Sequence, residues 1–143
     1  MKFILIVTIV FTSYVAKSQG LKYEVVSYQN CIYNLATDSL EDCKFMQGEK
    51  PSLFEIITEK NVLKQYAANK IKTFEIKKIF WYFSSTDYVI KDDHGLTWLY
   101  QVEDGEDGSF FTMLVWSCNE KGEPIYFNKK ASVGKWLIMF PVL

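Results

Sequence analysis

The sequence predicts a mainly β protein, an antiparallel meander that forms a small barrel or a sandwich. Two observations support this fold class. Short segments rich in aromatic and β-branched residues alternate with clusters of turn-forming residues along the chain, which is typical of antiparallel sheets. In addition, residues 96–118 have the pattern of a long apolar hairpin that folds at the acidic stretch 103–108, because an Asp-Gly step between two such segments favours a tight turn.

Residues 1–18 have the pattern of a signal peptide. A lysine precedes a short apolar run, and small residues at Ala16 and Ser18 precede Gln19, which is the usual order of charged end, apolar segment and cleavage site. The apolar run is too short to cross a bilayer. We therefore expect cleavage near Ser18-Gln19, a secreted or periplasmic location, no transmembrane helix in the mature chain, and a single β-rich domain over residues 19–143.

The charge of the chain excludes some classes of partner. All 16 basic residues are lysine, against 17 acidic residues, and arginine is absent. Arginine is the usual bidentate partner of phosphates and guanine edges, so this composition argues against nucleic acid. No basic amphipathic segment favours an anionic membrane surface. The expected partner is therefore an unknown small molecule or a protein.

The three cysteines predict one disulfide and one free thiol. An odd count in an exported chain leaves one cysteine unpaired or paired with another molecule. We prefer the local pair Cys31–Cys43, which closes a short loop worth about 3 kcal/mol in the chain-entropy model. Cys118 follows an apolar segment and is then expected to behave as a small buried apolar residue.

The first strand is expected over residues 21–29, followed by a stapled loop or short hairpin over residues 30–51. Residues 53–68 allow two interpretations. As a helix they share an apolar face, but Lys60 and Lys64 would lie in the middle of that face, which disfavours a helix packed on a core. We favour two strands, with one short helix in this segment as the alternative.

The middle of the chain predicts an irregular strand. Over residues 71–83 the apolar residues change from one face to the other near Lys77-Lys78, and a bulge that adds one residue explains such a change. A short strand over residues 88–90 then leads through a turn at residues 92–95 into the apolar hairpin.

The apolar hairpin has two faces whatever its turn. A turn at Asp104-Gly105, a turn at Asp107-Gly108 or a six-residue loop each pairs even positions of the first strand with odd positions of the second. One face carries Leu96, Trp98, Tyr100 and Val102 beside Phe111, Met113 and Val115; the other carries Thr97, Leu99 and Gln101 beside Phe110, Thr112, Leu114 and Trp116. Because both faces are largely apolar, we expect both to be shielded from water.

The last part of the domain is expected to contain two short strands. The polar residues 119–124 form a turn, residues 125–127 a strand, residues 128–134 a connection and residues 135–140 the final strand.

Groups that carry chemistry are sparse, so we predict no catalytic residues, no metal and no cofactor. His94 lies with Asp92 and Asp93 in a turn, and a hydrolase built on this group is one alternative, although no nucleophile motif accompanies it. No Cys-x-x-Cys spacing indicates zinc. The acidic residues 103–107 do not match a calcium-loop pattern.

The aromatic residues are the main candidates for a binding site. They make up 17% of the chain, and they serve either as core or as the lining of a cavity or platform that holds an apolar or aromatic-compatible ligand. The candidate ligand-binding residues are Trp81, Trp98, Tyr100, Phe111 and Trp116. We expect an exported, non-catalytic binding domain. A second alternative is an inhibitor or interaction protein that uses the acidic hairpin tip or an edge strand.

Overall fold

A computed structural model describes residues 21–46, 53–104 and 110–139. The predicted signal peptide, the tip of the apolar hairpin at residues 105–109 and the end of the chain after residue 139 lie outside the described residues. No helix in the described ranges is long and apolar enough to cross a membrane.

The described chain consists of antiparallel strands joined mainly by hairpins, which confirms the predicted fold class. The elements are β1 (Leu21–Asn34), β2 (Ser39–Phe45), β3 (Leu53–Ile57), the 3-10 turn η1 (Thr58–Lys60), β4 (Val62–Ala67), β5 (Lys70–Trp81), β6 (Ser85–Lys91), β7 (Thr97–Asp104), β8 (Phe110–Ser117) and β9 (Lys130–Met139). From β3 to β9 each strand pairs with the next one along the chain.

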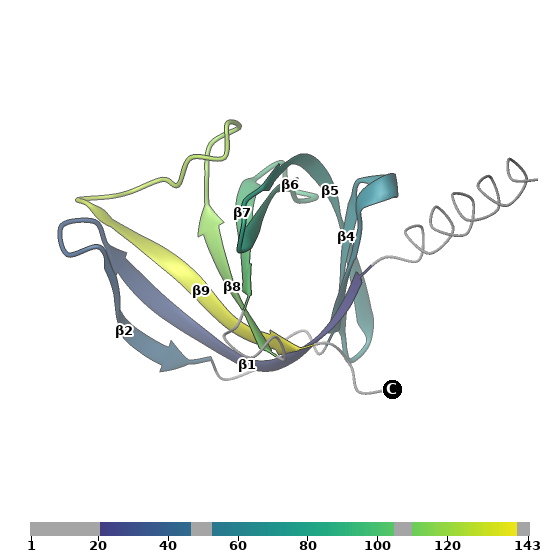
Figure 1. Ribbon diagram of the computed structural model, residues 1–143, viewed down its shortest axis with the longest axis horizontal. Coiled ribbons are helices and arrows are strands. Elements are labelled where there is room, and N and C mark those ends of the chain that lie inside the picture. Colours follow the sequence, from purple (N-terminus) through teal and green to yellow (C-terminus); the bar gives the residue numbers. More distant parts are fainter. Residues whose placement is uncertain (1–20, 47–52, 105–109, 140–143) are drawn as a thin grey trace, which may run out of the picture.

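The strand β1 closes this meander into an eight-stranded barrel. Its first residues, Leu21 to Glu24, pair with β3, whereas its remainder pairs with β9 as far as Asn34. Figure 1 shows the purple β1 and the yellow β9 running side by side, with β2 outside the ring along β1. The prediction left barrel and sandwich open, and this double pairing of β1 makes the fold a barrel.

Two bulges decide which side chains enter the barrel. The predicted bulge in β5 is confirmed, because the register with β6 shifts between Ile76 and Lys78. A second register shift, which no pattern in the sequence predicts, lies between Val25 and Ser27 of β1. Since each extra residue moves the following side chains to the other face, Tyr28 points to the same side as Val25.

Most of the apolar hairpin is shielded on both faces, as predicted, but Leu96 and Phe110 are exposed. Tyr100, Val102 and Met113 are buried among the residues of the barrel interior. On the outer face Leu99 and Trp116 are only 2% and 6% exposed. The observed register is the one expected for a turn at Asp107-Gly108, although that turn itself lies outside the described residues.

A second apolar cluster covers part of the outer face of the barrel. It contains Val89, Leu99, Trp116, Cys118 and Val133, and Tyr33 of β1 packs against it. The rings of Tyr33 and Trp116 meet edge to face with 5.0 Å between centroids. The outer side of the hairpin is therefore covered by the far half of β1, which extends beyond its pairing with β3.

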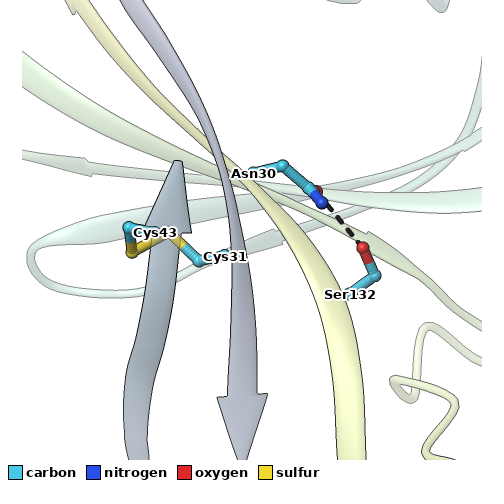
Figure 2. The surroundings of a disulfide bond; sticks show 4 residues. All are labelled: Asn30, Cys31, Cys43 and Ser132. Carbon is cyan, nitrogen blue, oxygen red and sulfur yellow. Dashed lines mark hydrogen bonds between the residues drawn. A yellow bond between two sulfur atoms is a disulfide. The ribbon is translucent and has the colours of Figure 1, made fainter. Parts of the chain in front are cut away.

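The predicted disulfide between Cys31 and Cys43 is confirmed. It joins β1 to β2 across 12 positions of sequence, and Figure 2 shows it on the β2 side of β1, whereas the hydrogen bond between Asn30 and Ser132 lies on the β9 side. A disulfide is compatible with an oxidising compartment.

The preference for strands over residues 53–68 is confirmed, whereas the strand expected over residues 125–127 is wrong. Residues 53–68 are the strands β3 and β4 rather than a helix, and η1 is the only helical turn between them; Asn61 ends that turn in the left-handed region at φ 54°. Residues 125–127 were expected as a strand but contribute only an isolated bridge between Phe127 and Lys130. The last strand begins at Lys130, five residues earlier than predicted, because pairing with both β1 and β8 stabilises a segment whose own pattern is weak.

Candidate functional site

The barrel holds an open cavity of about 790 Å³ near one end. Its lining comes from β1, β4, β5, β7, β8 and β9, from the turn at residues 92–94 and from one residue between β8 and β9. The lining residues are Tyr28, Asn30, Gln65, Ala67, Lys70, Lys72, Phe74, Asp92, Asp93, His94, Trp98, Tyr100, Val115, Ser117, Ile125, Ser132, Gly134 and Trp136. Eight-stranded barrels are just wide enough to hold one small ligand when side chains do not fill them. This volume is within the usual range for small-molecule sites.

A hydrogen bond across the lumen forms the floor of the cavity. Gln65 Nε2 donates to the Tyr100 hydroxyl at 2.6 Å, and these residues belong to β4 and β7, which have β5 and β6 between them. Two positions farther along the same strands, Leu63 and Val102 are buried in the packed core. We call the part of the lumen on the cavity side of this bond the hollow half, and the part that contains Leu63 and Val102 the filled half.

The wall of the hollow half contains a pair of aromatic rings held against a glycine. Tyr28 of β1 and Trp136 of β9 pack edge to face with 4.8 Å between centroids. A Cβ atom at Gly134 would lie 3.1 Å from Trp136 Nε1 and 3.3 Å from Tyr28 Cε2, which is closer than most real contacts of this kind. Gly134 therefore leaves the space that both rings occupy, and it thins the wall at this point.

The floor keeps hydrogen-bonding capacity for a ligand. Of the two N–H groups and one carbonyl oxygen of the Gln65 amide, the described residues use only the N–H that binds Tyr100. Burial is the main cause that raises the pKa of the Tyr100 hydroxyl, and burial also raises the pKa of Tyr28. Both hydroxyls therefore stay neutral at physiological pH, and the floor can bind an uncharged polar group but offers no charge to balance an ion.

Asp92 organises the turn at the rim of the cavity. Its carboxylate accepts hydrogen bonds from the backbone N–H groups of His94 and Leu96 at 2.9 and 2.8 Å, and from the indole Nε1 of Trp98 at 3.0 Å. The bond from Trp98, with help from the two backbone bonds, holds the pKa of this carboxyl below its ordinary value of 3.8. Because Asp92 fixes the indole of Trp98, it shapes the aromatic wall.

The five predicted ligand-binding residues are not all in one place. Trp98 and Tyr100 line the cavity. Phe111 belongs to the filled half, where it packs edge to face on Tyr23. Trp116 lies in the outer cluster, because its position on β8 has the opposite parity to Val115. Trp81 ends β5 and is 72% exposed, so the structure places it away from the cavity.

Three further residues shape the site although the sequence analysis did not select them. Tyr28 enters the lumen because of the β1 bulge, which no turn residue marks in the sequence. Trp136 points into the lumen because it pairs with Met113 of β8, a contact that the sequence of β9 alone does not predict. Gln65 was part of the ambiguous segment 53–68, and its polarity in an otherwise apolar alternation was the signal that could have identified it.

The predicted hydrolase group lies on the rim. His94 Nε2 is 3.8 Å from Asp93 Oδ1, and both side chains are about four-fifths exposed; Asp92 binds only the backbone N–H of His94. No described serine or threonine hydroxyl is hydrogen-bonded to the imidazole. Burial raises the pKa of the Cys118 thiol to about 11, which makes this cysteine a poor nucleophile at neutral pH.

No metal-binding group is found among the described residues: nowhere do three His, Cys, Asp or Glu side chains gather closely enough to hold an ion. Comparisons with known proteins give no further guide to the site, because no family model, curated protein or solved structure matches this chain.

Proposed function

We propose that this protein is an exported, non-catalytic carrier or receptor domain that binds one small, ring-containing, mainly apolar molecule inside the barrel. The observation that supports the proposal is the hollow half itself. Its aromatic walls suit flat apolar groups, and its floor of Gln65 and Tyr100 offers hydrogen bonds to a neutral polar group. Aromatic walls beside a small number of convergent polar groups, as at this floor, are typical of small-molecule binding.

The size of the cavity also favours a ligand over a packing defect. Buried interiors are normally packed as densely as organic crystals, and voids much larger than a water molecule are few. In the filled half Phe54, Leu63, Met113 and Ile138 have no exposed surface at all, so this barrel does pack tightly where its side chains meet. The space above Gln65 and Tyr100 is therefore a local feature, and a ligand there would bury aromatic surface that now faces solvent.

The experiment is a titration with N-phenylnaphthylamine, a neutral two-ring dye that fluoresces in apolar surroundings. We expect binding in the micromolar range by the wild-type domain. Ala67→Trp, which adds an indole to the cavity lining, should raise the Kd about tenfold or more. The matched control is Thr73→Trp, an exposed outward position on the neighbouring strand, which should leave the Kd unchanged. A wild-type domain that does not bind the dye, or equal binding by the two variants, would contradict the proposal.

A thermal-shift panel then identifies the class of natural ligand. The panel contains lipids, sugars and aromatic compounds, and we expect stabilisation by ring-containing apolar members rather than by sugars. Binding to the native but not to the unfolded chain raises the melting temperature, and the stabilisation grows with the logarithm of ligand concentration over Kd. At equal ligand concentrations the ranking of shifts therefore reports the preferred chemistry.

The other two hypotheses have no comparable support. The acidic hairpin tip lies mostly outside the described residues. The edge strand β2 is short and carries Glu41, Asp42 and Lys44, a composition that usually discourages pairing with another chain. The hydrolase stays a prediction. A hydrolytic activity that is unchanged in the His94→Ala variant would contradict it.

A further inference from the structure

We propose that the ligand carries an anionic group, a carboxylate or sulfonate, at the end that faces the rim, and that Lys70 and Lys72 bind this group. The inference rests on the proposed function and adds a charge to the ligand class. It would make the ligand an amphipathic anion, with its rings between the aromatic walls and its charged end in the mouth of the barrel.

The register of β5 directs these two lysines inward. Lys72 pairs with Gln65 and Lys70 pairs with Ala67, and both partners line the cavity. Farther along the same face of β5, Phe74 lines the cavity as well. Because side chains two positions apart share one face of a strand, Lys70 and Lys72 lie on the lumen face and at its open end, where they remain exposed.

Both ammonium groups are available to a ligand. Neither lysine forms an ion pair or a side-chain hydrogen bond with any other described residue. Two other described lysines are instead held by carboxylates, since Lys77 contacts Glu75 at 3.0 Å and Lys130 contacts Glu41 at 3.4 Å. Two unpaired cations on the lumen face of one strand therefore form the positive side of the rim.

The rim is divided in charge, because another part of it is acidic. The turn between β6 and β7 places Asp92, Asp93 and His94 at the cavity. The carboxylate of Asp92 already accepts three N–H groups, and Asp93 lies beside His94. An anion that enters the cavity is consequently attracted to the side formed by β4 and β5, which orients the ligand with its rings toward Tyr100 and Trp136.

The test compares two dyes that share one skeleton. Anilinonaphthalene sulfonate is N-phenylnaphthylamine with an added sulfonate, so the difference between their affinities isolates the charge. In the double variant Lys70→Gln with Lys72→Gln we expect the Kd of the sulfonate dye to rise about fivefold, since exposed ion pairs are each worth up to about 1 kcal/mol. The Kd of the neutral dye should change less than about twofold, and about 0.5 M NaCl should remove most of the difference for the sulfonate.

The control variant removes the same charge elsewhere. Lys78→Gln with Lys91→Gln changes two exposed lysines at positions on the outer face, and both dyes should bind it as they bind the wild type. Suppose that the neutral dye binds, but that replacing Lys70 and Lys72 leaves the Kd of the sulfonate dye unchanged, or that the control variant raises this Kd equally. The inference is then overturned while the proposed function stands. If both dyes weaken together, the lysines shape the cavity rather than bind charge, and the inference is again overturned. If the wild type binds neither dye, both proposals fail.

Discussion

The two halves of the barrel lumen are built by the same strands but are packed differently. On β8, Met113 is fully buried in the filled half, and Val115, two residues along, lines the cavity. On β9, Ile138 is fully buried, and Trp136 lines the cavity. Alternation along a strand places all four side chains in the lumen. What differs is whether the side chains that meet from opposite walls are long enough and apolar enough to close the space.

The difference teaches that polar groups and a glycine can keep a small barrel open. Gln65 and Tyr100 bond to each other across the lumen and end the apolar core at that level, because a core that packed against them would leave their remaining polar atoms unsatisfied. At the same level Gly134 contributes no side chain.

The largest expected effect is the loss of a large side chain from the filled half. Met113→Ala should lower the free energy of unfolding by about 2–5 kcal/mol, because the surrounding residues cannot collapse into the new space. Val115→Ala should cost only about 1 kcal/mol, since that side chain already borders a cavity. Urea denaturation of both variants measures the contrast, and equal losses would show that the two halves are packed alike.

Next in size is the removal of the disulfide. Cys31→Ala with Cys43→Ala should cost about 3 kcal/mol in the chain-entropy model. Because Cys31 follows Asn30, which lines the cavity, hydrogen exchange should quicken in β1 and β2 more than in β3 and β4. Adding reductant to the double variant provides the control and should change nothing further. Uniform acceleration over the whole barrel would contradict a local role at the hollow half.

A smaller effect is expected from the turn at the rim, and it depends on pH. Asp92→Ala should cost about 1–2 kcal/mol at neutral pH, because it removes three hydrogen bonds to a carboxylate, whereas the neighbouring Asp93→Ala should cost less than about 0.5 kcal/mol. The pKa of Asp92 is lowered in the folded state. Its stabilisation is therefore fully present above the unfolded value near 3.8 and is lost as the pH falls through the folded pKa.

Urea denaturation at a series of pH values from neutral to about 2 tests this linkage. The difference between wild type and Asp92→Ala should shrink as the pH falls below the unfolded value. A difference that stays constant over this range would show that the carboxylate charge does not contribute.

The smallest expected effect concerns the floor. Tyr100→Phe removes the hydroxyl that accepts from Gln65 and should cost about 1 kcal/mol. Tyr88 is a matched control in the filled half, since it is 5% exposed and its hydroxyl has no hydrogen-bond partner among the described residues; Tyr88→Phe should be nearly neutral. If Tyr88→Phe lowers the free energy of unfolding as much as Tyr100→Phe, the hydrogen bond across the lumen does not contribute to stability.

Local patterns predicted the walls of this molecule better than its interior. Three features could be predicted from local properties of the sequence. The change of phase predicted the bulge at Lys77-Lys78, the parity of positions predicted the two faces of the hairpin, and the short sequence separation predicted the Cys31–Cys43 bridge. The strand nature of residues 53–68 also followed from local evidence, the misplaced charges of Lys60 and Lys64. The strand expected at residues 125–127 was wrong, because short apolar stretches form strands only where a neighbour is available to pair with.

The lining of the cavity could be predicted only in part. Trp98 and Tyr100 were selected as candidate ligand-binding residues and do line it, whereas the same reasoning also selected Trp81, Phe111 and Trp116, which the structure places elsewhere. Aromatic content alone does not distinguish the lumen from the outer cluster. That distinction depends on Tyr33 and its strand covering the outer face, a contact between residues far apart in the sequence.

The sequence by itself determined that the chain forms antiparallel strands, where most of them turn, and which side chains share a face, since these depend on neighbours along the chain. Only the tertiary structure decided that β1 pairs with both β3 and β9, and that closure turned one shared face into a lumen. It also brought Gln65 within reach of Tyr100, across two intervening strands, and so left space between them and the rim. The physical reason is that a cavity is a property of opposing walls, and opposing walls are set by long-range pairing rather than by local preference.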